Sequence, residues 1–329
     1  MSDDATRARF PGLTTGYESF FLRACAPQGG LGVWIRYTVR CGRGQQPTGS
    51  LWCTLFDADA PAPLAAKLTI PEAASGVGDD WIGIGAARLG AGSASGEIRT
   101  QGAPPAAWNL QFTGAEPFWH LSRSWMYRAP LPRTKPISIH PVAVFDGTLT
   151  VAGRSIDVSR WPGMVGHNWG SQHAERWIWL HTMSPDTGGE TTWLDVVLAR
   201  IKFAGRTTPW IASGGICVDG KRVALGGAGR AGRTKITETP HGLDFVLPGA
   251  RMSVSGTVHA PQARFVGWVY ADPDGSRHHV ANCSIADLSL RVDRPGRTAT
   301  SLQTAGLAAY ELGTRERDAG RSTQPFTDG

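Results

Sequence analysis

The chain lacks the features that place a protein in a membrane or outside the cell. It has only five cysteines, an odd number with no Cys-x-x-Cys pair, and this usage is typical of reduced thiols rather than a disulfide framework. The N-terminal residues contain no apolar stretch like that of a signal peptide. No apolar run approaches the length needed to span a membrane. We therefore expect a cytoplasmic protein.

The chain also lacks a large excess of charge of either sign. The net charge of +6 is spread along the chain, and no run of Lys or Arg suggests a nucleic-acid partner. The Gly-rich runs near residues 90 and 227 lack the strand-then-helix context of a phosphate-binding loop, and neither a dinucleotide fingerprint nor a nucleophile elbow is present. These absences argue against nucleotide-dependent enzymes and serine hydrolases. We expect no cofactor.

Glycine and proline, by contrast, are abundant, with 42 and 22 residues. They separate short stretches rich in aromatic and β-branched residues, a rhythm typical of a β-barrel or sandwich. A hairpin is expected over residues 142–151, turning at Asp146-Gly147, and a single helix over 302–312. The other predicted strands cover residues 17–25, 31–39, 50–57, 64–70, 80–86, 95–100, 107–113, 155–158, 176–183, 192–203, 210–218, 221–225, 234–239, 243–247, 252–259 and 265–270.

A length of 329 residues exceeds the usual size of one domain, so two domains are expected. The strand rhythm is similar in both halves, and we place the boundary near Gly170. The sequence thus predicts an all-β protein with an N-terminal domain over residues 1–170 and a C-terminal domain over residues 171–329.

Tryptophan is over-represented, with 13 residues where about 1% of a chain is typical. Residues 163–195 hold four of them, together with three histidines. If 176–183 and 192–203 are strands, side chains alternate between faces. Trp177, Trp179 and His181 then share one face, and Trp193 shares a face with Asp195. Antiparallel pairing of these strands would line one enclosed space with indoles, an imidazole and a carboxylate.

Three chemical interpretations of this stretch are weighed. Metal binding by His167, His173 and His181 is not expected, because their spacing matches no common zinc pattern. Acid catalysis is better founded, since apolar neighbours raise the pKa of a carboxyl such as that of Asp195, and indole faces stabilise positive charge. The structural alternative is that Asp195 only pairs with an arginine, for example Arg176 or Arg200.

Several segments resemble the carotenoid 1,2-hydratase (hydroxyneurosporene synthase)-like family. They are residues 17–23 with 33–38, Gly166-His167-Asn168-Trp169-Gly170 followed by Trp177-Ile178-Trp179, and Tyr310-Glu311-Leu312-Gly313. The superfamily also holds AttH-like proteins, stress-survival proteins, tocopherol-cyclase relatives and decalin-forming Diels–Alderases. The resemblance spans most of the chain. It implies two lipocalin-like antiparallel β-barrels with a C-terminal helix, and the handling of large apolar molecules.

In the hydratases, acid catalysis involves a His-x-Trp pair and a downstream Tyr-x-Asp pair. His167 and Trp169 match the first pair, and Trp193 and Asp195 match the second with Trp in place of Tyr. The resemblance implies that Asp195 donates a proton and that His167 holds the water. The further residues expected to contact the ligand are Trp177, Trp179, His181, Trp119, His120 and Trp34.

The expected function is therefore that of a cofactor-free enzyme acting on a hydrophobic, unsaturated metabolite, with hydration of a C=C bond as the reaction. A cyclase or pericyclase with the same pocket is the first alternative, and a non-catalytic lipid-binding or stress-related protein is the second. The expected partner is an apolar small molecule, and the composition leaves room for peripheral contact with a membrane. Because ligand pockets favour domain interfaces, His167 and Trp169 are expected at or near a cavity there.

Overall fold

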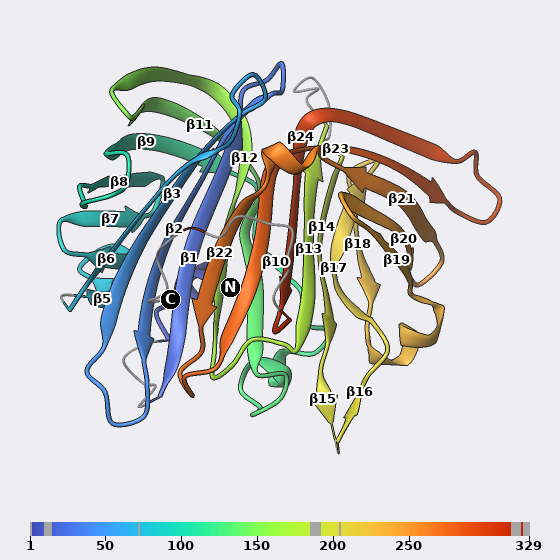
Figure 1. The fold of residues 1–329 in the computed structure, drawn as a ribbon. Helices are drawn as coiled ribbons and strands as arrows, with labels where there is room; N and C mark the ends of the chain where they lie inside the picture. Colours follow the sequence, from blue (N-terminus) through green and yellow to red (C-terminus); the bar gives the residue numbers. More distant parts are fainter. Residues whose placement is uncertain are drawn as a thin grey trace.

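The computed structural model describes residues 2–9, 15–71, 73–184, 192–203, 205–316 and 324. Within these ranges the chain is almost entirely antiparallel β-structure, in two large sheets that stand side by side (Figure 1). The predicted all-β class with two lipocalin-like halves is confirmed. No helix in the described ranges is both long and apolar enough to cross a membrane.

The first sheet comprises the strands up to Gly170 and curls around a hydrophobic core. Alternate side chains along each strand point into this core. Phe20, Leu22, Val33 and Ile35 point into this core, while the residues between them face the second sheet. Its main path among the described residues runs β4-β3-β2-β1-β12-β11-β9-β8-β7-β6-β5. The strands are β1 (Gly16–Cys25), β2 (Leu31–Cys41), β3 (Thr48–Asp57), β4 (Leu64–Ile70), β5 (Ala73–Val77), β6 (Asp80–Ile84), β7 (Ala87–Gly90), β8 (Ser93–Ile98), β9 (Ala106–Gly114), β10 (Phe118–Trp119), β11 (Thr134–Val151) and β12 (Arg154–Gly170).

The second sheet begins after a connection of residues 171–175, and in the described ranges it follows the order β18-β17-β14-β13-β24-β23-β21-β20-β19. Ile178, Leu180, Leu194 and Val196 point into its own core. The strands are β13 (Arg176–Met183), β14 (Trp193–Arg200), β17 (Ile211–Val218), β18 (Lys221–Gly226), β19 (Lys235–Thr239), β20 (Gly242–Pro248), β21 (Ser253–His259), β22 (Val266–Ala271), β23 (Arg277–Asp293) and β24 (Thr300–Thr314), beside the small pair β15 (Lys202–Phe203) and β16 (Arg206–Thr207).

The outer faces of β1–β3, β11 and β12 pack against those of β13, β14 and β22–β24, and we call this contact the seam. Part of it is aromatic: the rings of Trp52 and Trp268 lie 5.0 Å apart, and Trp34 lies 6.4 Å from Trp268. All three indoles are buried. The rest of the seam is unusually polar, and that part holds most of the residues discussed below.

The predicted C-terminal helix is wrong, because residues 302–312 lie within β24, between β13 and β23. Leu and Ala favour helices weakly, but tertiary context overrides propensity. The same residues also have the alternation of a strand: Tyr310 and Leu312 enter the second core, whereas Ala309 and Glu311 face the seam.

The predicted hairpin at residues 142–151 is also wrong. Asp146 and Gly147 continue β11 through a register shift, in which Gly147 has φ of 135°, a value that L-residues rarely adopt. The chain instead turns at Ala152 and Gly153, between β11 and β12. Asp146-Gly147 thus marks irregular backbone within the strand, and the chain reverses only at the next glycine, Gly153.

Candidate functional site

The candidate site lies in the polar part of the seam, where β13 pairs with β14 as the sequence suggested. His181 faces Asp195 across the pair, and Trp179 faces Val197. Trp179, His181 and Asp195 are all buried. The predicted juxtaposition of indole, imidazole and carboxylate on one face is therefore confirmed.

Asp195 accepts two hydrogen bonds, one from each sheet, and lies close to His120. Its Oδ1 accepts a hydrogen bond from Trp179 Nε1 at 2.9 Å, and its Oδ2 accepts one from the Ser138 hydroxyl at 2.5 Å. His120 Nε2 lies 3.6 Å from the same Oδ2. The arginine pairing considered from the sequence is wrong, because Arg176 pairs with Glu238 and Arg200 donates to a backbone carbonyl.

His120, Ser138 and Asp195 form one hydrogen-bonded chain. Ser138 gives its hydroxyl hydrogen to Asp195, so it accepts from His120 Nε2 at 2.7 Å. The other ring nitrogen, Nδ1, faces the carbonyl of Ser213 at 3.2 Å, which only accepts. Both ring nitrogens of His120 therefore face oxygen atoms that can accept a hydrogen bond. We call these three residues the proton chain.

The pKa of Asp195 reflects these contacts. Burial alone raises the pKa of a carboxyl, but the His120 imidazole, His181 and the Ser138 hydroxyl together hold the pKa of Asp195 below its usual value. The expectation of a raised pKa at Asp195 is therefore wrong. Donors from elsewhere in the fold surround Asp195, and the apolar residues that flank it in the sequence did not reveal them.

His181 is neutral and fixed in one tautomer. Its Nδ1 accepts from Arg23 Nη1 at 2.8 Å, and its Nε2 donates to the carbonyl of Pro141 at 2.9 Å. Burial, reinforced by the Arg23 charge, lowers the pKa of His181 to about 4. Arg23 also donates to the carbonyls of Ser284 and Leu307, near the register shifts between β23 and β24.

His181 should make the protein sensitive to acid. Its folded-state pKa lies below the ordinary value of 6.5, so the unfolded chain binds the proton first, and stability falls as the pH drops from about 6.5 to 4. At 1.36 kcal/mol per pKa unit the loss is about 3 kcal/mol. In His181→Asn, whose amide oxygen can still accept from Arg23, this part of the loss should disappear. Urea unfolding at several pH values measures it.

A matched control is His259→Asn, at an exposed histidine far from the seam. That variant should keep the full acid sensitivity of the native chain. Equal loss of stability in native protein and His181→Asn between pH 6.5 and 4 would contradict a neutral buried His181.

His167 and Trp169 lie on the opposite face of β12, inside the first sheet, and not in the seam. The His167 ring stacks on Phe20 at 3.9 Å, and its Nε2 lies 2.9 Å from Glu18 Oε1. Its Nδ1 faces the carbonyl of Ala5 at 2.9 Å, in the short helix α1 (Ser2–Thr6). Glu18 and His167 are therefore hydrogen-bonded to each other in the interior of the first sheet. They form a second polar group, apart from Asp195.

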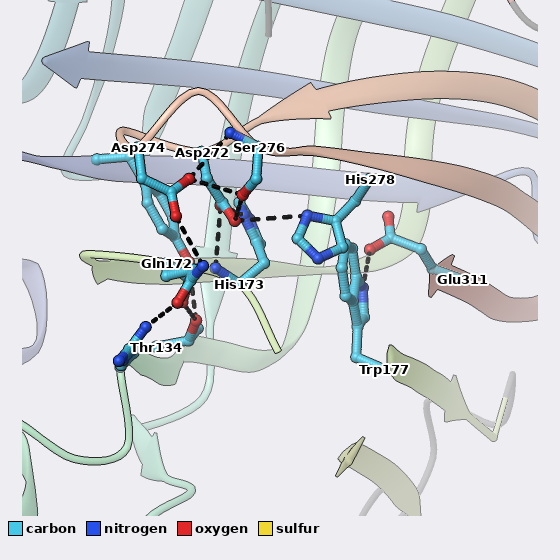
Figure 2. A network of polar contacts seen from close by, with 11 residues as sticks. Thr134, Gln172, His173, Trp177, Asp272, Asp274, Ser276, His278 and Glu311 are labelled. Atoms are coloured by element: carbon cyan, nitrogen blue, oxygen red, sulfur yellow. Dashed lines mark hydrogen bonds and ion pairs between the residues drawn. The ribbon is translucent and has the colours of Figure 1, made fainter. Parts of the chain in front are cut away.

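A third group, shown in Figure 2, lies where residues 171–175 meet the β22–β23 turn. His173 Nδ1 contacts Asp272 Oδ1 at 2.6 Å, and the His173 ring stacks on Trp177 at 5.1 Å. Trp177 Nε1 donates to Glu311 at 2.9 Å. Burial raises the pKa of Asp272, but its contacts with His173 outweigh this and leave the pKa lowered.

The remaining predicted ligand contacts are spread along the molecule. Trp193 packs edge-on against Phe118 at 5.3 Å, beside the proton chain. Trp119 packs against Tyr127 at 4.8 Å, and Trp34 belongs to the aromatic part of the seam. Sequence reasoning missed Ser138, Arg23 and Glu18. Glu18 alone had a local signal, since it alternates with Phe20 and Leu22 on an inward face.

A cavity of about 550 Å³ lies elsewhere, on the outer face of the second sheet, where Lys235, Asp244 and Arg291 are among its lining residues. None of the residues predicted from the sequence lines it. His167 and Trp169 are buried within the first sheet and do not line this cavity.

Fold and site together define a double lipocalin-like β-protein with a buried polar seam. No protein-family model matches the chain. It is 28% identical over 298 residues to an uncharacterised protein of Mycobacterium tuberculosis, found in strains H37Rv and CDC 1551, covering 88% of this chain and 86% of that one. A crystal structure of a candidate AttH protein from Nitrosomonas europaea is similar in fold, with a TM-score of 0.51 and 11% identity over 94% of this chain and 97% of that chain.

Proposed function

We propose that this protein is a cofactor-free enzyme that hydrates a C=C bond of a large hydrophobic metabolite, with the proton chain as its acid and base. The observation that carries the proposal is the buried hydrogen-bonded chain of His120, Ser138 and Asp195, in which both ring nitrogens of His120 face oxygen atoms. In this proposal the chain holds one extra proton, with His120 protonated on both nitrogens and Asp195 ionised. A proton donor fixed in a buried site can transfer its proton to an alkene bound beside it, because water does not compete for the proton.

The reaction balances within this group. His120 gives its proton to the less substituted CH carbon of a terminal trisubstituted alkene, the π-electron pair forms the new C–H bond, and the other carbon becomes a tertiary cation. Water adds to the tertiary cation and returns its surplus proton to His120. Asp195 and Ser138 act as positioning residues, because they keep the imidazole charged and correctly turned. In this proposal the acid is His120, and not Asp195 as the resemblance implied.

Aromatic side chains beside the proton chain suit a cationic intermediate. The Phe118 ring lies 5.9 Å from His120 and 5.3 Å from Trp193. Indole and phenyl faces attract positive charge through their quadrupoles, by about 0.5–2 kcal/mol each. Phe118 itself stands over Gly215, where an added Cβ would meet the ring at 2.3 Å. That glycine therefore makes room for the aromatic wall.

We propose that the substrate enters beneath residues 115–133, the segment that carries His120. β10 is only two residues long and pairs only with β11 among the described strands. The following 3-10 helix (Ser124–Tyr127) has no buried residue. Trp125 is 63% exposed and Leu131 48% exposed, so this segment presents apolar side chains to an incoming ligand.

A cyclase or pericyclase is the second candidate, and the protonation of His120 favours it too. An imidazolium that donates a hydrogen bond to a substrate carbonyl withdraws electrons from a conjugated diene or dienophile. The proton then stays on the imidazole and is not transferred to the substrate. The same aromatic walls would fold the polyene. In this version the imidazole stays protonated throughout.

Isotope incorporation tests the proposal and separates the candidates. We expect the protein, incubated with an acyclic carotenoid or terpenoid in ¹⁸O-labelled heavy water, to yield a product with one labelled oxygen and one deuterium on adjacent carbons. His120→Gln should form none. A cyclised isomer without labelled oxygen would support the pericyclase instead. Substrate that only quenches tryptophan fluorescence and returns unchanged would rule out both reactions.

A further inference from the structure

We propose that His173, Asp272 and His278 form a binding site for a divalent transition-metal ion, of which Zn²⁺ is the expected occupant. Three separate segments supply these residues: the connection between β12 and β13, the turn after β22, and β23. One ligand atom from each lies within 4.8 Å of the other two (Figure 2). The cluster stands apart from the proton chain and does not depend on the proposed reaction.

The hydrogen bonding of His278 is an independent observation that points to a ligand. Its side chain is fully buried, yet neither ring nitrogen makes a hydrogen bond of acceptable geometry. An unsatisfied buried polar group is costly, and native proteins seldom keep one without a reason. The Nδ1 atom of His278 lies 3.5 Å from Asp272 Oδ2. A metal ion between them would be coordinated by His278 Nδ1, which makes no hydrogen bond.

The other two residues are held in place for the same task. Asp272 Oδ1 contacts His173 Nδ1 at 2.6 Å, and Oδ2 accepts from the Ser276 hydroxyl at 3.2 Å. The His173 ring is stacked between Tyr17 at 4.5 Å and Trp177 at 5.1 Å. Supporting contacts of this kind orient metal ligands and are part of a working metal site.

The donor set indicates which ions fit. Two imidazoles and one carboxylate suit Zn²⁺ and similar transition metals, whereas Ca²⁺ and Mg²⁺ prefer oxygen ligands throughout. Three protein ligands leave at least one coordination position for water or another small ligand. The ion would join the chain between the two sheets to the β22–β23 turn. The sequence argued against a metal site because His173 was considered only together with His167 and His181. Its partners in the structure, Asp272 and His278, lie about 100 residues further along the chain.

Metal binding to the full chain tests the proposal. After treatment with EDTA, the native protein should bind one Zn²⁺ per chain in calorimetric titration, and Co²⁺ in its place should give d–d absorption typical of mixed nitrogen and oxygen ligands. His173→Phe keeps the ring stacking and should bind far more weakly. Loss of a direct ligand should exceed the about 10–100-fold loss that follows removal of a supporting partner.

His278→Phe is the second variant, and His259→Phe, at an exposed histidine outside the cluster, is the matched control. The control should bind like native protein, and Zn²⁺ should raise the melting temperature of native and control protein only. Substoichiometric binding by native protein, or equal binding by native protein and His173→Phe with an unchanged fold by circular dichroism, would overturn the proposal.

Discussion

Asp195→Asn will reduce turnover by about 10²–10⁴-fold, the usual contribution of general acid–base catalysis, with little loss of stability. The amide can donate to Ser138, which then turns its hydroxyl toward His120 Nε2, while Nδ1 still donates to Ser213. Every hydrogen bond of the proton chain is thus kept, but the extra proton is gone. Turnover of an accepted substrate and urea unfolding measure the two effects.

Asp244→Asn, at an exposed carboxylate on the outer face of the second sheet, is the control and should behave as native protein. Nitrogen NMR of the histidine rings supplies the direct reading. His120 should be an imidazolium in the native chain and neutral in Asp195→Asn. A neutral His120 in native protein, or full turnover by the variant, would remove the proton chain from the mechanism.

Arg23→Met will lower the free energy of unfolding by about 3 kcal/mol or more. The guanidinium is buried and donates to His181 and to the carbonyls of Ser284 and Leu307. Methionine fills similar space without donors, so three buried acceptors lose their partners. Each such loss costs about 1–3 kcal/mol. Urea unfolding at neutral pH measures the change.

Arg154→Met is the matched control, because Arg154 pairs with Asp57 on the surface, where ion pairs contribute only about 0–1 kcal/mol. A loss below about 1 kcal/mol in Arg23→Met would mean that the two carbonyls find other donors. Arg23 would then be an ordinary buried side chain rather than the contact that joins the two sheets.

Patterns between residues close in the sequence predicted most of the strands and the faces that their side chains share. Alternation at Trp177, Trp179 and His181 gave the shared face, and turn residues placed most strands. The helix over 302–312 failed because its spacing also suits a strand, and only pairing with β13 and β23 decides between them.

The chemistry of the site depends on partners that no local pattern reveals. Ser138 lies 57 residues from Asp195, and Arg23 lies 158 residues from His181. The pKa of Asp195 was misjudged for this reason: its neighbours in sequence are apolar, but its neighbours in space are donors. His167 was grouped with Asp195 because both stand in one stretch, yet it points away from the seam toward Glu18.

The order of strands has a consequence for how the chain folds. In each half the first strand pairs with the last, β1 with β12 and β13 with β24. Neither sheet can be completed until its final strand has left the ribosome, and closing such long loops is slow. The first half can finish while the second is still being made. Until the second half is complete, the outer face of the first half, with Arg23, Trp34 and Trp52, stays exposed to solvent. We expect chaperones to be needed most at this stage.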